Sequence, residues 1–130
     1  MHHDGTKAED WDRTIAVDQT SIFLGMKMAS RHLKASGHRS VIHISSIFGI
    51  SGGFGTSPAH HAVEGAIRTL TKNVALLRAQ QGVRVNSVHP GFIDTPLLAE
   101  TQGAPFEQIM IDMTPMGRLG RPGPLVERPR

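Results

Sequence analysis

The fold is decided by residues 41–95, which read VIHISSIFGISGGFGTSPAHHAVEGAIRTLTKNVALLRAQQGVRVNSVHPGFIDT. In order, this stretch contains a short apolar strand, a glycine-rich loop, a long amphipathic helix, a second apolar strand and the turn His89-Pro90-Gly91. A strand, a crossover helix and a parallel strand bring both strand ends to one crevice, where open α/β sheets bind ligands. We therefore expect an α/β fold with its site at the strand ends.

The two strands are predicted at residues 40–45 and 83–88, because apolar residues on both faces are typical of buried parallel strands. Ser57 and Pro58 are expected to be the N-cap and first residue of the crossover helix. That helix should end at Gln81-Gly82. Residues spaced by three and four are predicted to form its core stripe: Ala59, Val63, Ala66, Leu70, Val74 and Leu77.

Upstream, residues 9–35 predict a long helix that Gly37 ends. Asp18 falls on the apolar stripe of this helix, where an unpaired carboxylate is costly, so we expect it to meet a partner or to bend the helix away. Downstream, we expect short helices at residues 97–101 and 105–113, and a loose basic tail at 118–130. The stripe of the first helix consists of Trp11, Ile15, Ile22, Met26, Ala29 and Leu33.

Composition excludes several classes of protein. The 130 residues include no cysteine, which excludes disulfides and thiolate metal sites. No apolar run approaches the ~20 residues that cross a bilayer, and the polar start lacks a secretory pattern, so we expect a cytoplasmic protein without membrane contact. The pI near 10.0 accompanies a net charge of only +3 and reflects the absence of Tyr and Cys, so no nucleic-acid partner is expected.

Three segments carry a family resemblance: residues 17–25 (VDQTSIFLG), 42–49 (IHISSIFG) and 84–96 (RVNSVHPGFIDTP). Together they resemble the short-chain dehydrogenase/reductase family, and are similar to members that oxidise secondary alcohols with NAD or NADP. The resemblance covers residues 9–122 and matches only the central and later family elements. It implies a partial Rossmann-like, doubly wound parallel sheet, its central and C-terminal portion only, with residues 1–130 as a single partial domain.

In that family a Ser polarises the substrate oxygen, a Tyr transfers its proton, a Lys holds the cofactor ribose, and an Asn supports a proton relay. Ser46 stands at the Ser position and Asp18 at the Asn position. His60 stands at the Tyr position, in a chain without any tyrosine, and Glu64 at the Lys position. The Lys-to-Glu change reverses the charge beside the ribose. We therefore expect a catalytically impaired homologue, by ancestry an oxidoreductase of small alcohols or ketones.

The cofactor side is half present. Pro90, Gly91, Ile93 and Thr95 match the family turn whose backbone and Thr hydroxyl meet the nicotinamide carboxamide. The glycine-rich turn that holds the pyrophosphate has no counterpart among the 130 residues. We expect binding of NAD or NADP to be weak or absent.

Two other functions are kept as alternatives. Ser46, His60 and Glu64 form a constellation like a nucleophilic triad, which would make the chain a hydrolase, or a reductase with His60 as acid. Alternatively, the chain is a non-catalytic dimerisation module, because the resemblance implies that the helices at residues 9–35 and 57–80 correspond to those that pair in the family's four-helix dimer interface. Separately, two strands alone leave one sheet face bare, so assembly is expected. A metal site is not expected, since adjacent histidines on a helix diverge by about 100°.

Overall fold

The computed structural model describes residues 5–35, 39–54, 56–101, 103 and 105–123, and the side chains of residues 99–101 are not among the features described. Gly37, predicted to end the first helix, and residues 124–130 of the predicted tail lie outside these ranges. The chain divides into two compact units, Met1–His89 and Pro90–Arg130.

One long helical run opens the first unit. It consists of α1 (Ala8–Thr14), a π-helical segment η2 (Ile15–Thr20) and α2 (Ser21–Ala35), which confirms the helix predicted at residues 9–35. Asp18 lies in the π-helical segment and is exposed, so its predicted place on the apolar stripe is wrong. A π turn takes up more residues than an α turn, so side chains within it depart from the spacing used to define that stripe.

The sheet of the first unit has two parallel strands, β1 (Arg39–Ile44) and β2 (Val83–Val88), in a register that runs from Arg39 opposite Val83 to Ile44 opposite Val88. Between them the chain forms a 3-10 turn, η3 (Ile47–Gly49), then α3 (Pro58–Arg78) and a closing turn, η4 (Ala79–Gln81). Gly82 follows in the left-handed region, with φ 70°. The predicted strand–helix–strand crossover and the α/β class are therefore confirmed.

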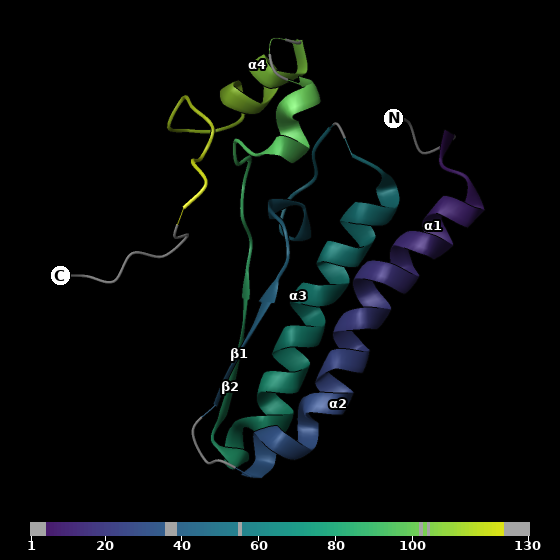
Figure 1. The fold of residues 1–130 in the computed structure, drawn as a ribbon, viewed down its shortest axis with the longest axis vertical. Helices are drawn as coiled ribbons and strands as arrows, with labels where there is room; N and C mark the ends of the chain where they lie inside the picture. Colours follow the sequence, from purple (N-terminus) through teal and green to yellow (C-terminus); the bar gives the residue numbers. More distant parts are fainter. Residues whose placement is uncertain (1–4, 36–38, 55, 102, 104, 124–130) are drawn as a thin grey trace, which may run out of the picture. The chain divides into compact units, whose positions relative to one another are not determined.

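Both long helices cover the same side of this sheet (Figure 1). Leu33 of α2 packs there with Val83 and Val85 of β2, and partly buried residues surround them: Met26, Ala29, Val41, Val74 and Ala75. On the opposite face of β1, Ile42 and Ile44 are 59% and 58% exposed. The sheet face that the sequence predicted to be bare is thus apolar and accessible.

The stripe predicted for α3 is only partly right. Ala59 and Val63 are buried as expected, but Leu77 is 67% exposed. Ala66 and Leu70 instead line grooves shared with the first helical run. A helix that contacts both a sheet and another helix needs two apolar faces. The single stripe predicted for α3 combined residues from both of these faces. The side chains of α3 that are buried are Ala59, Val63, Glu64, Ile67 and Thr71.

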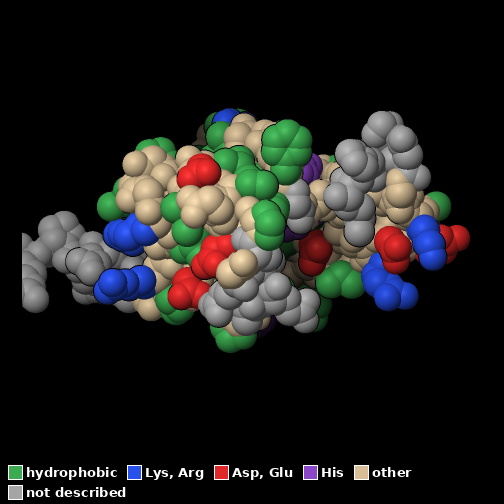
Figure 2. Space-filling model, turned by 90° about the horizontal axis from the view of Figure 1, so that it is seen from above, with side chains coloured by type: hydrophobic (Ala, Val, Ile, Leu, Met, Phe, Trp, Pro, Cys, Tyr) green, Lys and Arg blue, Asp and Glu red, His purple; other side chains and the backbone are tan. Residues whose placement is uncertain are grey.

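The second unit contains a parallel bridge between Ile93 and Gly120, a 3-10 helix η5 (Pro96–Thr101) and α4 (Pro105–Asp112). These confirm the two short helices expected beyond Pro96. Figure 2 shows hydrophobic side chains interspersed with charged ones over the surface seen from above. Within the described parts of the chain, no helix is long and apolar enough to cross a membrane.

Candidate functional site at the strand ends

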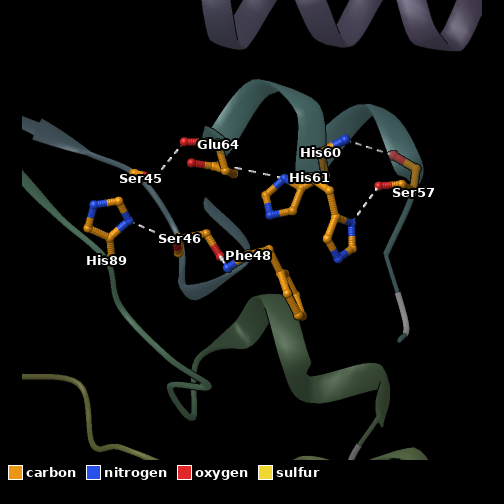
Figure 3. Close-up of polar contacts among 8 residues, drawn as sticks. All are labelled: Ser45, Ser46, Phe48, Ser57, His60, His61, Glu64 and His89. Atoms are coloured by element: carbon orange, nitrogen blue, oxygen red, sulfur yellow. Dashed lines mark hydrogen bonds and ion pairs between the residues drawn. The ribbon is translucent and has the colours of Figure 1, made fainter. Parts of the chain in front are cut away.

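Ser46 is the second residue after β1 and caps the turn η3. Its Oγ accepts a hydrogen bond from the N–H of Phe48 (3.2 Å), which leaves the hydroxyl hydrogen available to another acceptor. The preceding Ser45 is buried, and its Oγ donates to the carbonyl oxygen of Glu64 (3.2 Å). The strand end that carries Ser46 is thereby attached to α3 (Figure 3).

His60 and Glu64 occupy the first turns of α3, which Ser57 begins as predicted: its Oγ accepts from the N–H of His60 (3.3 Å). The Nδ1 of His60 lies 3.6 Å from the Oε1 of Glu64, as Figure 3 shows. Glu64 is only 8% exposed, and its Oε2 has no hydrogen-bond partner among the described residues. A carboxylate oxygen buried in this way loses its hydration without replacement, which is energetically unfavourable.

Phe48 links these groups, and no role was predicted for it from the sequence. Its ring meets His60 edge-on, with centroids 6.0 Å apart, and lies 4.6 Å from the ring of His61. The Nδ1 of His61 is 3.2 Å from the carbonyl oxygen of Ser57, so it is the donor, and its buried Nε2 has no partner within the described ranges. The sequence signal that could have indicated this role is an aromatic residue two positions after a strand-end serine.

His89, at the end of β2, is a second residue that sequence reasoning missed as part of the site. Its Nδ1 donates to the carbonyl oxygen of Ser46 (2.9 Å), because a carbonyl can only accept. In the neutral ring, Nε2 then accepts from the hydroxyl of Ser87 (2.9 Å). The backbone also joins the strand ends, because the N–H of Ser45 donates to the carbonyl oxygen of Val88 (2.8 Å). Pro90 has no N–H to continue this ladder, so the imidazole of His89 supplies the next connection.

The predicted residues are only partly brought together. Within the described chain, no hydrogen bond joins Ser46 to His60, so the triad hypothesis lacks its nucleophile-to-base contact. Asp18 is exposed on η2, and its role stays a prediction. No three His, Asp or Glu side chains of the described residues are grouped so that they could hold a metal ion.

The predicted cofactor turn belongs to the second unit. The bridge there uses the N–H of Asp94, which donates to Gly120 (2.9 Å), and the carbonyl of Phe92, which accepts from Gly120 (2.8 Å). Backbone groups alternate in direction along an extended chain, so the N–H and C=O of Ile93 point to the opposite edge. Thr95 directly precedes η5, and its carbonyl accepts from the N–H of Leu98 (2.8 Å).

A crossover unit, a strand-end serine and a Pro-Gly turn are the features on which the predicted resemblance rests. Comparison with known proteins finds the same class. A family model described as enoyl-(acyl carrier protein) reductase matches residues 2–127. The chain belongs to the short-chain dehydrogenase/reductase family, as the resemblance predicted.

Among curated relatives, a 2,5-dichloro-2,5-cyclohexadiene-1,4-diol dehydrogenase from Sphingobium indicum is 40% identical over 114 residues, which is 88% of this chain and 45% of the relative. An NADP-dependent (R)-specific alcohol dehydrogenase from Lentilactobacillus kefiri is 38% identical over 120 residues, 90% of this chain and 47% of the relative. The chain thus spans about half the length of the relatives it matches.

Solved structures show the same correspondence. A gluconate 5-dehydrogenase from Burkholderia cenocepacia, in complex with NADP and tartrate, superposes with a TM-score of 0.83 at 29% identity. The match covers 91% of this chain and 46% of that one. The two strands and their helices therefore correspond to part of the larger α/β fold of that structure, which confirms the prediction of a partial Rossmann-like fold.

Proposed function

We propose that this chain is a short-chain dehydrogenase/reductase homologue whose site derives from an NAD(P)-dependent oxidoreductase of small alcohols or ketones, and that its hydride-transfer activity is impaired. The observation that carries the proposal is the burial of Glu64 beside His60, with one carboxylate oxygen left without a partner. The substrate class is taken from the relatives, which are named as dehydrogenases of a diol and of alcohols.

The residues at the strand end retain one part of the chemistry. Ser46 still has a hydroxyl hydrogen to donate to a substrate oxygen, because Phe48 uses only its lone pair. His60 presents an imidazole, whose neutral ring has one nitrogen that donates a hydrogen bond and one that accepts. Glu64, however, places an acceptor-only carboxylate where the family has a cation, so it cannot donate hydrogen bonds to a ribose or stabilise a developing negative charge.

The residues present do not complete a site for a nicotinamide cofactor. The turn from Pro90 to Thr95 offers the backbone groups of Ile93, which supports a contact with a carboxamide. The carboxylate of Glu64 opposes binding, because it stands where the family has a ribose-binding Lys and adds repulsion towards a cofactor that carries phosphates. We infer weak or absent binding of NAD and NADP to this chain.

Titration of the purified chain with NADH and with NADPH, followed by nicotinamide fluorescence, tests the proposal. No saturation is expected at micromolar cofactor, and no turnover of cyclic or linear secondary alcohols. The variant His60→Tyr/Glu64→Lys, which restores both family residues, is the matched comparison, and it is expected to stay inactive because the chain has no glycine-rich phosphate turn. Micromolar binding or measurable alcohol oxidation by the wild-type chain would overturn the proposal.

A second candidate function, assembly through the long helices, is favoured by an apolar groove between α2 and α3. This groove has a volume of about 310 Å³. Phe23 and Leu77 line it, and both are largely exposed. Large apolar side chains gathered along two adjacent helices are typical of a protein interface.

The charges along the first helical run favour a second copy of the chain as the occupant. Its first half carries one basic residue, Arg13, and four carboxylates: Glu9, Asp10, Asp12 and Asp18. Acidic and basic side chains are both visible at the α1 end of the molecule in Figure 2. Its second half carries Lys27, Arg31 and Lys34 and no carboxylate. Two copies packed antiparallel would place opposite charges side by side.

The mass of the chain in solution, measured by size exclusion with light scattering, tests this candidate. The wild-type chain is expected to be a dimer or larger. Leu77→Asp, which places a charge in the groove, is expected to give a monomer. Leu97→Asp is the control, because Leu97 is exposed on η5 and belongs to neither long helix. A monomeric wild-type chain would exclude assembly through these helices.

A further inference from the structure

A buried histidine connects β1 to α3 on the helix-covered side of the sheet. His43 is 5% exposed, and its Nδ1 lies 2.8 Å from the Oγ1 of Thr71, which is also buried. The hydroxyl of Thr71 donates its single hydrogen to the carbonyl oxygen of Ile67 (2.7 Å). Because that hydrogen is already used, Oγ1 must accept from His43, and Nδ1 must carry the imidazole proton.

The other ring nitrogen of His43 has no hydrogen-bond partner among the described residues. This Nε2 has a lone pair in the neutral ring and is buried. A buried acceptor without a donor is tolerated at modest cost, whereas a buried N–H of a cation without an acceptor is much more costly. Burial accordingly lowers the pKa of His43 below its ordinary value of 6.5.

The groups around His43 do not supply a counter-charge. From β2, the register partner is the uncharged Ser87, and the ring of His89 beyond it is already engaged by Ser87 and Ser46. From α3, Glu64 lies two turns before Thr71, about 10 Å along the axis, and its Oε1 is turned to His60. Arg39 begins β1 four residues away, and α2 contributes apolar side chains to the core on this side: Met26, Ala29 and Leu33.

We propose that His43 and Thr71 form an acid-sensitive lock that holds β1 on α3 and opens when His43 takes up a proton. The lock lies close to the candidate site along both elements: Ser46 follows His43 by three residues, and Thr71 follows Glu64 by seven. Opening it would separate the strand that presents Ser46 from the helix that carries His60 and Glu64. The lock is independent of whether the site is catalytic.

The sign of the pH effect follows from proton counts. Below pH 6.5 the unfolded chain binds a proton at residue 43 that the folded chain resists, so the free energy of unfolding falls as the pH falls. Above about pH 7.5 both states are neutral at this residue and the contribution is constant. Within the window between the two pKa values, the unfolding constant should rise by up to about tenfold per pH unit.

Urea unfolding of the full chain between pH 8 and pH 5 tests the lock, with two variants for comparison. His43→Asn keeps a donor for Thr71 but cannot titrate, and it should remove most of the pH dependence. His32→Asn is the matched control, because His32 is exposed on α2, and it should behave like the wild type. Equal pH slopes in His43→Asn and wild type, or a wild-type chain without a cooperative transition, would overturn the proposal.

Imidazole ¹⁵N NMR of the wild-type chain provides a measurement that does not depend on whether His43→Asn folds. The expected spectrum shows His43 as the neutral Nδ1–H form, with a pKa below its ordinary value of 6.5. An Nε2–H form, or titration of His43 at its ordinary value, would contradict the lock directly.

Discussion

The main chain of Gly49 lies against the main chain of Glu64. A Cβ atom added at Gly49 would be 2.6 Å from the carbonyl oxygen of Glu64 and 2.8 Å from the Oγ of Ser45. Ser45 donates to that same carbonyl, so the turn after β1 and the first turns of α3 meet at a backbone contact that only glycine permits. The position of Ser46 relative to His60 and Glu64 depends on this contact.

Gly49→Ala should therefore lower the free energy of unfolding by about 1–3 kcal/mol, the usual cost of forcing an extra methyl group into a filled space. The atoms it would meet belong to the backbone, which cannot rotate away as a side chain can. Urea unfolding at pH 7.5 measures the loss. Gly52→Ala is the control: a Cβ there has nothing within 4 Å, and the change should be under about 0.5 kcal/mol. Equal losses in the two variants would show that the contact is loose.

Much of the first unit could be predicted because its signals are local. Ser57-Pro58 marks a helix start through capping chemistry, Gln81-Gly82 marks the end, and apolar runs mark both strands. The burial of Glu64 could not be predicted, since it depends on which face of α3 the sheet covers. The π-helical segment around Asp18 could not be predicted for a different reason. Helical periodicity assumes a regular helix, and a local insertion does not change the composition.

At the candidate site, one contact among the named residues could be predicted from the sequence and others could not. His60 and Glu64 do lie together, as their spacing of four residues implies. The contacts of Ser46 with Phe48 and His89 come from a turn and from the neighbouring strand, 43 residues away in the case of His89. Such contacts follow only once the strands are paired.

Glu64→Met is expected to stabilise the chain by about 1–3 kcal/mol, because it removes a buried, unpartnered carboxylate oxygen and retains the volume of the side chain. Thermal or urea unfolding at pH 7.5 provides the comparison with wild type. Glu9→Met, on the exposed surface of α1, should change stability by less than about 0.5 kcal/mol. Destabilisation by Glu64→Met would mean that the carboxylate makes a favourable interaction in solution.

Leu33→Ala should cost about 2–4 kcal/mol, since Leu33 is the buried residue of α2 and packs on Val83 and Val85. The substitution removes apolar contacts between the first helical run and the sheet and leaves a cavity. Leu76→Ala tests the same chemical change on α3, where the leucine is exposed, and should be nearly neutral. Similar costs at the two positions would indicate that α2 does not pack on the sheet as described.

The bare face of β1 leads to a prediction about solubility. Ile42 and Ile44 point away from the helices, so Ile42→Thr/Ile44→Thr should change the free energy of unfolding by less than about 1 kcal/mol while reducing aggregation of the 130-residue chain. Threonine preserves β-branching and replaces an exposed apolar surface next to unpaired strand edges with a hydroxyl. Light scattering during storage at 25 °C measures the effect. Val41→Thr, on the covered face of the same strand, should instead cost about 1–2 kcal/mol and leave aggregation no lower, because its hydroxyl would be partly buried in the core. If the double variant aggregates as fast as wild type, the exposed isoleucines are not the surface through which these chains associate.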